Sequence, residues 1–494
     1  MSSLSSLSSL SSLSSLLSLS WLRRLALAIV ASALLAGCAN APYRPYVTAG
    51  SEGADCPGAS VGTPASLTTP EVGPPPTPTY TLHFLEFDDQ GWPYPDPAGK
   101  ASPGHKIDCA IGDLVQRLKH YKVMTFVYVH GWHHSAAEHD EDVAKFRALL
   151  DKQAKRWSGT RQVVGYYIGW DGETLDVPGL KHATFWTRKN AAHKVAEGSV
   201  REFFARMKAI RNHANRPRVA SLTDRHHQCR YKGDFLGPDC PLRTVMIGHS
   251  FGAWILFAST SPFVMETLAG GSDVLDEEPT ETERERGIAD LILLLNPAFE
   301  ATRYDPLFNA ARRYRNPRYQ PPLLVSITST ADWATGMAFP AARVINSILQ
   351  HPAKSTLEAR AMKRTHGHMD EYLSHELTLA GPWPREQIEA DQCPARQALP
   401  YQSSAHELRK EFIAAMRDEV APQRTHMPVR TFCGDLHLAG LPNPAVGPLS
   451  IVWNIRTHAD IIPNHDRIHE PVLEYFLSQL YEDIREMPRF ELKR

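Results

Sequence analysis

The chain has 494 residues, of which 43% are hydrophobic and 22% are charged, and this composition excludes a disordered or fibrous protein. Its 53 Lys and Arg residues stand against 54 Asp and Glu residues, which gives a formal net charge of −1. Nucleic-acid-binding proteins carry an excess of basic residues that neutralise phosphates, so the balanced charge argues against a nucleic-acid partner.

The N-terminus has the pattern of a secretion signal. An apolar run, Leu25–Gly37, follows two arginines and is too short to span a bilayer. The run ends at Cys38 in the sequence LAGC, which resembles the lipobox of bacterial lipoproteins. The resemblance implies that residues 1–37 are removed and that Cys38 is lipidated and attaches the chain to a membrane. Ala39 stands where an Asp would resemble the inner-membrane retention signal, so the analogy favours the outer membrane, facing the periplasm.

Residues 38–79 are rich in proline and show no hydrophobic period, which indicates a tether. From Tyr80 onward, short apolar runs alternate with amphipathic segments, the pattern of an α/β domain with a mostly parallel sheet and helices on both faces. The predicted strands are Tyr80–Phe87, Val123–Val129, Gln162–Trp170, Arg243–Gly248, Ile288–Leu295, Leu323–Thr328 and Leu449–Ile455. An irregular stretch of about residues 351–447 is too long for a connection and is interpreted as a cap-like insertion, and a last helix begins at Pro471.

Six cysteines remain once Cys38 is set aside. In an oxidising compartment, an even number predicts up to three disulfides. The short spacing favours Cys229 with Cys240, and the scheme is completed by Cys393 with Cys433 and Cys56 with Cys109.

A G-x-S-x-G motif follows one of the predicted strands. Its serine is Ser250, flanked by Gly248 and Gly252, and a helix-compatible run begins at Phe251. A serine on a sharp strand-to-helix turn needs glycine neighbours, because side chains there would clash, and the turn lifts the hydroxyl away from the sheet. The context predicts a nucleophilic serine.

On these residues, the chain from Tyr80 to Glu486 resembles the α/β-hydrolase superfamily, its serine esterases and lipases in particular. The sequence YVHGWHH after an earlier strand is similar to the oxyanion loop of those enzymes. The resemblance implies an oxyanion hole formed by the backbone N–H groups of Trp132 and Phe251.

The superfamily order of nucleophile, acid and histidine directs the search for the other two groups. Asp332 lies just past a strand end and is the expected acid, with a helix N-cap as its alternative role and Asp305 as the reserve candidate. His465 precedes the last helix and is the expected base, with His458 next and His469 assigned to the helix entry.

The predicted function is therefore a serine esterase or lipase that cleaves a small-molecule or lipid acyl ester without a cofactor or metal. Two alternatives stay open. One is an inactive hydrolase-fold lipoprotein that acts as a binding module. The other is a metal-dependent hydrolase, because His-rich segments occur, although the H-x-H-x-D run at 366–370 has Glu371 where the metallo-β-lactamase signature requires His.

Overall fold

A computed structural model describes residues 42–43, 80–95, 104–172, 181–215, 240–270, 287–314, 322–347, 350, 356–384, 386, 429–441 and 450–485. The chain divides into Met1–Ala41 and Pro42–Arg494, and the fold described here belongs to the second unit. The signal segment, Cys38 and all but two residues of the tether lie outside the described residues, so the lipid anchor stays a prediction.

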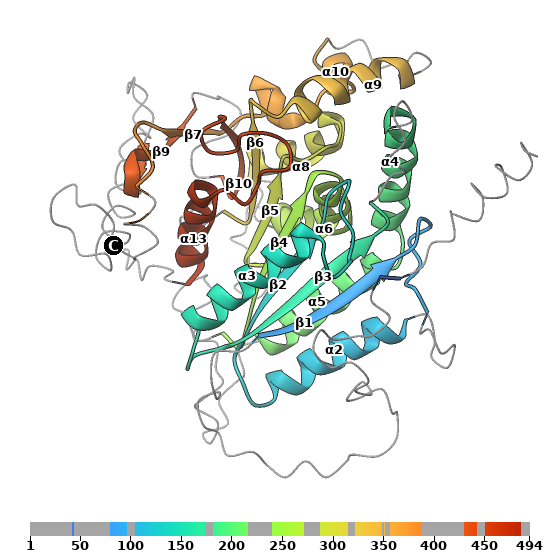
Figure 1. Cartoon of the computed structure of the whole chain (residues 1–494), viewed down its shortest axis with the longest axis vertical. Helices are drawn as coiled ribbons and strands as arrows, with labels where there is room; N and C mark the ends of the chain where they lie inside the picture. Colours follow the sequence, from blue (N-terminus) through green and yellow to red (C-terminus); the bar gives the residue numbers. More distant parts are fainter. Residues whose placement is uncertain are drawn as a thin grey trace, which may run out of the picture. The chain divides into compact units, whose positions relative to one another are not determined.

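The described residues form an α/β fold around one mostly parallel sheet of ten strands (Figure 1). Its spatial order is β1-β3-β2-β4-β5-β6-β10-β7-β9-β8. In this spatial order, all neighbouring strands from β1 to β7, β10 included, are parallel. Strand β9 runs antiparallel to both β7 and β8. The strands are β1 (Tyr80–Phe87), β2 (Val123–Val129), β3 (Gln162–Trp170), β4 (Leu242–His249), β5 (Leu291–Leu295), β6 (Leu324–Ser329), β7 (His375–Leu379), β8 (Val429–Phe432), β9 (Leu436–Gly440) and β10 (Val452–Thr457).

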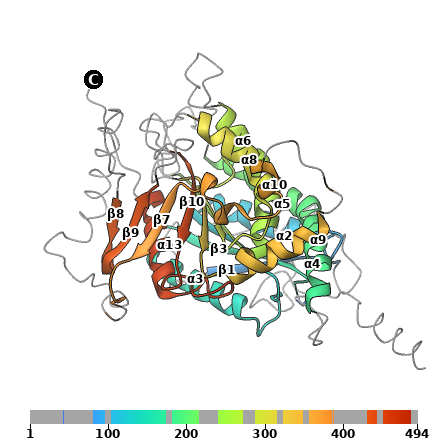
Figure 2. The same cartoon turned by 90° about the horizontal axis from the view of Figure 1, so that it is seen from above.

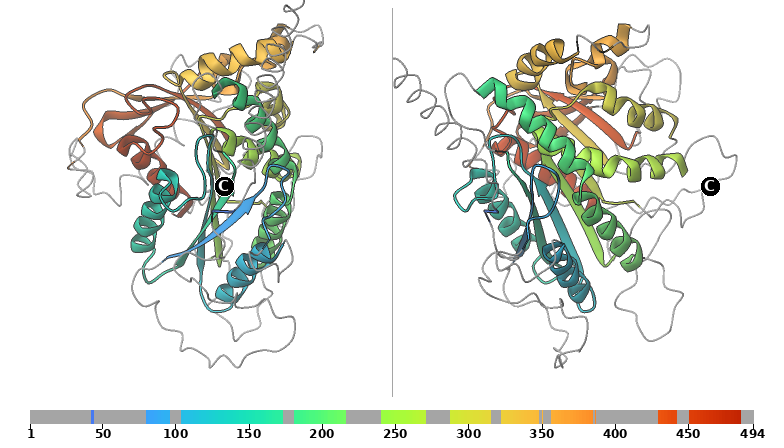
Figure 3. Two further views of the ribbon diagram at one scale, coloured as in Figure 1. Left: turned by 45° about the vertical axis from the view of Figure 1, so that its right-hand side comes forward. Right: turned by 90° about the vertical axis from the view of Figure 1, so that its right-hand side faces the viewer.

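Helices cover both faces of this sheet, as Figure 3 shows. One core lies under α2 (His105–Leu118), α4 (Lys181–Glu197), α5 (Val200–Ala214), α6 (Ser250–Gly270) and α8 (Ala301–Arg313). The opposite core lies under α3 (Glu141–Arg156) and α13 (Pro471–Arg485). The shorter helices are η1 (Ala334–Ala338, a π-helix), α9 (Phe339–Asn346), α10 (Thr356–Ala361), η2 (His366–His368), η3 (Asp370–Tyr372) and η4 (Cys433–Asp435).

The order of the central strands creates the place for a site. Strands β2 and β4 are neighbours, with Val129 opposite Gly248 at their carboxyl ends. The helix after β2, α3, packs on one face, and the helix after β4, α6, packs on the other. Their connecting segments therefore diverge at the carboxyl ends of β2 and β4, which is where ligands bind in open α/β sheets.

The segment at about 351–447 was predicted to be irregular, but part of it forms strands. Its described strands β7, β8 and β9 continue the main sheet beyond β10 (Figure 2). The strands have only four or five residues and carry charged or polar side chains such as Glu376 and His437 at alternate positions, so they lack an apolar run. Residues 387–428 lie outside the described residues, and the cap stays a prediction.

Strand β5 is shorter than the expected Ile288–Leu295. The residue before it, Asp290, is buried and is hydrogen-bonded to β4 through its side chain. The Asp290 carboxylate accepts hydrogen bonds from Arg243 at 2.6 Å and from the backbone N–H of Thr244 at 2.7 Å. The side chain therefore turns toward β4, and ladder pairing begins at Leu291.

Cys109, Cys240 and Cys433 are each disulfide-bonded. The predicted pairing also involves Cys56, Cys229 and Cys393, which lie outside the described residues, so the connectivity stays a prediction. Within the described part of the chain, no helix has the length and hydropathy required to cross a bilayer.

Candidate active site

Ser250 occupies a strained turn between β4 and α6. Its φ is +55°, in the left-handed region that side chains other than glycine adopt rarely. A Cβ on Gly252 would lie 2.2 Å from the backbone oxygens of both Val129 and His130, and one on Gly248 would lie 2.8 Å from the backbone of Gly252. Gly252 is therefore required by the close approach of α6 to β2, and Gly248 by its own close approach to the first turn of α6.

The structure brings Ser250, His465 and Asp332 together from three separate strand ends. His465 Nε2 lies 2.7 Å from Ser250 Oγ, and His465 Nδ1 lies 2.8 Å from Asp332 Oδ2. An ionised carboxylate only accepts, so Nδ1–H donates to Asp332 and Nε2 is left to accept the serine proton. Ser250 and Asp332 are buried, and the side chain of His465 is 13% exposed, which leaves part of the imidazole accessible.

Asp332 both contacts the expected base and makes the hydrogen bond of a helix-capping residue. Its Oδ1 accepts the backbone N–H of Thr335 at 3.1 Å, as a capping residue does, while its Oδ2 accepts from His465 and from the Thr335 hydroxyl. The Thr335 oxygen in turn lies 2.9 Å from His368 Nε2. The carboxylate is thus held from two sides, and the cap serves to orient it.

The electrostatics of the site favour a charged pair. Burial alone raises the pKa of Asp332, but His465 and Thr335 lower it below its usual value. Burial alone lowers the pKa of His465, but the charge and hydrogen bond of Asp332 raise it above its usual value. An imidazolium formed during a reaction would therefore be stabilised by the neighbouring carboxylate.

Two residues that the sequence analysis did not select fix the backbone of His465. His249 Nε2–H donates to the His465 carbonyl at 2.9 Å, and the Asn296 side chain donates to the same oxygen at 3.0 Å. Asn296 follows β5 with a φ of +42°, and its Oδ1 accepts from the N–H of Ser329 at 3.1 Å. A polar residue next to the motif serine and a polar residue at a strand end are the only sequence signals for these roles.

The loop after β2 lies directly against the serine. A Cβ on Gly131 would lie 2.6 Å from His249 Nδ1 and 3.0 Å from Ser250 Cβ. His130 fixes this loop, because its Nε2 accepts from the N–H of Trp170 at 3.0 Å and its Nδ1–H donates to Gly131 O at 2.9 Å. Burial lowers the pKa of His130 to about 4, so the ring is neutral and keeps both hydrogen bonds.

The expected oxyanion donors, Trp132 and Phe251, directly follow the two residues that meet here, Gly131 and Ser250. Phe251 is the second residue of α6, so its N–H belongs to the first helical turn, which has no intrahelical acceptor. The Trp132 and Phe251 rings lie 6.2 Å apart, and Phe185 lies 5.5 Å from the first and 5.3 Å from the second. Aromatic rings therefore form an apolar wall beside the serine.

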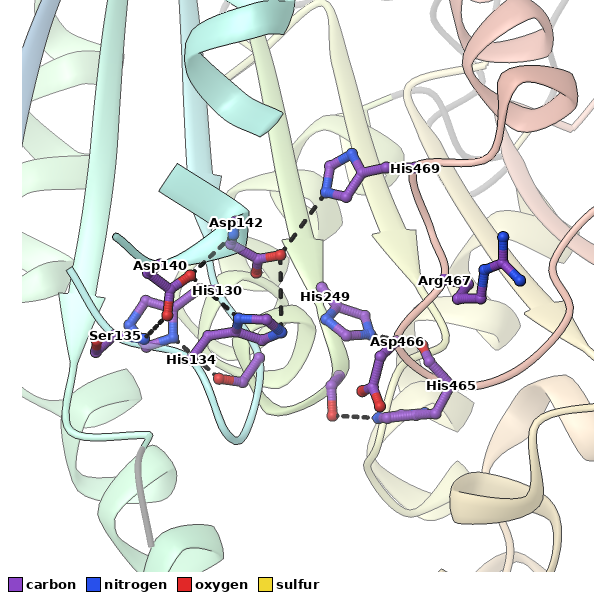
Figure 4. A network of polar contacts seen from close by, with 12 residues as sticks. His130, His134, Ser135, Asp140, Asp142, His249, His465, Asp466, Arg467 and His469 are labelled. Atoms are coloured by element: carbon purple, nitrogen blue, oxygen red, sulfur yellow. Dashed lines mark hydrogen bonds and ion pairs between the residues drawn. The ribbon is translucent and has the colours of Figure 1, made fainter. Parts of the chain in front are cut away.

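A polar network holds the rest of this loop, as Figure 4 shows. Asp140 accepts from the N–H of Ser135 at 2.8 Å and from His134 Nδ1–H at 3.1 Å, and His134 and His469 each approach Asp142 within 3.7 Å. Burial lowers the pKa of His134, but Asp140 and Asp142 raise it to about 9. The network joins the loop to the start of α3.

The reserve candidates lie elsewhere. Asp305 is on α8, where it accepts hydrogen bonds from Asn309 and Tyr372. His458 is 40% exposed in its side chain and lies 3.1 Å from Glu376. His469 contacts Asp142 near the beginning of α13 rather than Ser250.

The histidines considered for a metal take separate partners. His366 lies 2.7 Å from Ser326, Asp370 accepts from Arg456, and His375 lies 2.8 Å from Ser374. Among the described residues, one group has metal-ligand spacing, namely His249, His465 and Asp466. Both nitrogens of His465 already contact Ser250 and Asp332, and His249 Nε2 donates to a carbonyl, so these residues do not fit a metal site.

Comparisons of the chain with protein-family models, with curated proteins and with solved structures found no match.

Proposed function

We propose that this protein is a serine hydrolase of the α/β-hydrolase fold that cleaves carboxylic esters through an acyl-enzyme. The observation that carries the proposal is the hydrogen-bonded series Ser250–His465–Asp332, with distances of 2.7 and 2.8 Å, at the carboxyl edge of a parallel sheet. The positive φ of Ser250 supports it, because such strain is typical of functional sites and requires support from the surrounding structure.

The geometry allows a two-step acyl transfer. His465 Nε2 takes the proton of Ser250 Oγ, which attacks the ester carbonyl, and the carbonyl oxygen becomes an oxyanion that accepts from the N–H groups of Trp132 and Phe251. The imidazolium then gives its proton to the leaving alcohol as the carbon–oxygen bond breaks. Water, deprotonated by His465, releases the acid and restores Ser250. Asp332 holds the imidazole and stabilises its charge throughout.

The substrate class follows from the wall of the site. Trp132, Phe185 and Phe251 offer apolar surface for an acyl chain or an aromatic group, so a small-molecule or lipid acyl ester is the proposed substrate. Rates on p-nitrophenyl esters of graded chain length would define the acyl group.

A fluorescent fluorophosphonate should label Ser250, because this probe reacts only with an activated serine. The labelling rate should rise with pH and level off, with a midpoint above the ordinary histidine pKa of about 6.5. Protonated His465 cannot accept the serine proton, so reactivity is lost as pH falls through the raised pKa of His465. Gel fluorescence after timed labelling between pH 5 and pH 9 measures this.

The same experiment on cell fractions tests the proposed envelope attachment. The labelled band should appear in the membrane fraction and should move to the soluble fraction in Cys38→Ala.

A folded protein that takes up no fluorophosphonate label between pH 5 and pH 9 would contradict the proposed activity and favour the inactive binding module instead.

Asn296→Gly should lower kcat about 10- to 100-fold with little change in KM, because a small displacement of a reacting group has effects of this size. Glycine tolerates the positive φ of Asn296, so the variant removes the side-chain contacts with His465 while sparing the backbone. Steady-state kinetics measures both constants.

Asn309→Ala is the matched control, because Asn309 donates to Asp305 on α8 and does not contact the site. An unchanged kcat in Asn296→Gly, or an equal loss in the control, would contradict the positioning role of Asn296.

A further inference from the structure

A second polar site lies in a cavity of about 320 Å³. Lys189 and His193 on α4, Glu300 and Arg303 at the start of α8, and Arg343 on α9 line it. We call it the cationic cavity. The side chains of Lys189, Glu300 and Arg343 are each more than nine-tenths buried, so the charged floor of the cavity is part of the folded interior.

The charges of the cationic cavity do not cancel. Lys189 Nζ and Arg343 Nε both contact the same carboxylate oxygen of Glu300, the arginine at 3.0 Å. One carboxylate therefore faces two buried cations, and Arg303 adds a third positive charge at the cavity wall. Burial, together with the charge of Lys189, lowers the pKa of His193 to about 4, so His193 is neutral at pH 7 and leaves the excess of cations unchanged.

Arg303 is available for a ligand. It is exposed, its guanidinium carbon lies 5.8 Å from the centroid of the Trp254 ring, and it makes no ion pair with any described side chain. Packing on an aromatic ring limits the motion of a guanidinium while leaving its N–H groups free to bind an oxyanion in a fork.

We propose that the cationic cavity binds a small dianionic oxyanion group, with a phosphate monoester as the ligand class. Among the described residues that line the cavity, three cations against one carboxylate leave a net charge of +2, which a dianion neutralises and a monocarboxylate does not. The cavity volume exceeds that of a phosphate group, so there is room for part of the esterified alcohol. Trp186, which also lines the cavity, offers an apolar surface to it.

The cavity lies on the other side of the aromatic wall that flanks Ser250. Lys189 lies one helical turn after Phe185 on α4, and Phe185 contacts the rings of Trp132 and Phe251. Lys189 Nζ also lies 4.9 Å from the centroid of Phe339, which is itself 6.3 Å from Phe185. The aromatic wall therefore separates the anion site from Ser250, and anion binding needs no participation of the serine.

Binding should be strongest near neutral pH. Burial lowers the pKa of Lys189, and the charge and hydrogen bond of Glu300 offset this only in part. The resulting pKa is about 8, so the ammonium loses its proton above that pH. A phosphate monoester gains its second charge above a pKa of about 6. The charged groups that face Lys189 are Glu300, Arg303 and Arg343. Affinity for the dianion should therefore fall below the second pKa of the phosphate and above the pKa of Lys189.

Isothermal titration calorimetry with methyl phosphate, at pH 7.2 in a low-salt buffer free of phosphate and sulfate, tests the proposal on the full chain. We expect saturable binding at one site that is at least about tenfold tighter than the binding of acetate, the singly charged comparison. Arg303→Gln should weaken methyl phosphate binding about tenfold or more, because charge-assisted hydrogen bonds to the oxyanion are lost. Raising the pH to 9 should weaken it as well.

Arg312→Gln is the matched control, because Arg312 is another arginine of α8 that packs over an aromatic ring but does not line the cavity. It should bind methyl phosphate as the wild type does. No saturable binding in the folded wild type, acetate binding as tight as that of methyl phosphate, or equal affinities in Arg303→Gln and the wild type would each overturn the proposal. None of these measurements depends on ester hydrolysis.

Discussion

Ser250→Ala should abolish ester hydrolysis and fluorophosphonate labelling while leaving the fold intact. Loss of a nucleophilic serine from a catalytic triad lowers kcat by roughly 10⁵- to 10⁶-fold. Among the described residues, the Ser250 hydroxyl is hydrogen-bonded to His465, and alanine removes only this hydroxyl, so the core around α6 keeps its packing. Initial rates on a p-nitrophenyl ester, with the melting temperature measured in parallel, check both parts.

Ser259→Ala is a suitable control on the same helix. Ser259 is also buried, and its hydroxyl donates to the backbone oxygen of Ala196 at 3.0 Å rather than to a residue of the site. It should lose about 1 kcal/mol of stability with the hydrogen bond and keep its labelling. Retained turnover in a folded Ser250→Ala variant would remove Ser250 from the mechanism.

His465→Ala and Asp332→Ala should each lower kcat by several orders of magnitude, and the double variant should be little worse than His465→Ala alone. The reason is that Asp332 acts through the imidazole that it orients, so once His465 is absent the carboxylate has nothing left to stabilise. We expect roughly 10⁴-fold for the acid and a larger loss for the base. Steady-state kinetics on the four proteins gives the coupling directly.

His458→Ala and Asp305→Ala are the controls for this cycle, since His458 contacts Glu376 and Thr330, and Asp305 contacts Asn309 and Tyr372. Both should stay near the wild-type rate. A large loss in His458→Ala with little in His465→Ala, or additive losses in the double variant, would show that the three groups do not act as a unit.

Much of the sheet is predictable from the sequence because its strands are buried on both faces. The runs Tyr80–Phe87, Val123–Val129 and Gln162–Trp170 have the predicted limits, and nearly all of their residues are buried, as expected of strands covered on both faces. The turn at Ser250 is equally local, because its two glycines and the adjoining strand and helix are close in the chain. Strands β7, β8 and β9 were not predicted, because they are short and carry polar side chains at alternate positions, so they lack a continuous apolar run.

The sequence by itself determined the α/β class, the strand-to-helix turn at Ser250 and a short set of acid and base candidates, because each depends on residues that are neighbours in the chain. Tertiary structure decided which candidates meet: Asp332 and His465 are 133 residues apart and touch only because β6 and β10 pair in parallel. It also decided the contacts of His249 and Asn296 with His465, and the grouping of Lys189, Glu300 and Arg343 in the cationic cavity. No local pattern specifies such contacts, because a hydrogen bond or an ion pair depends on distance in space, and only the packed sheet and helices fix that distance.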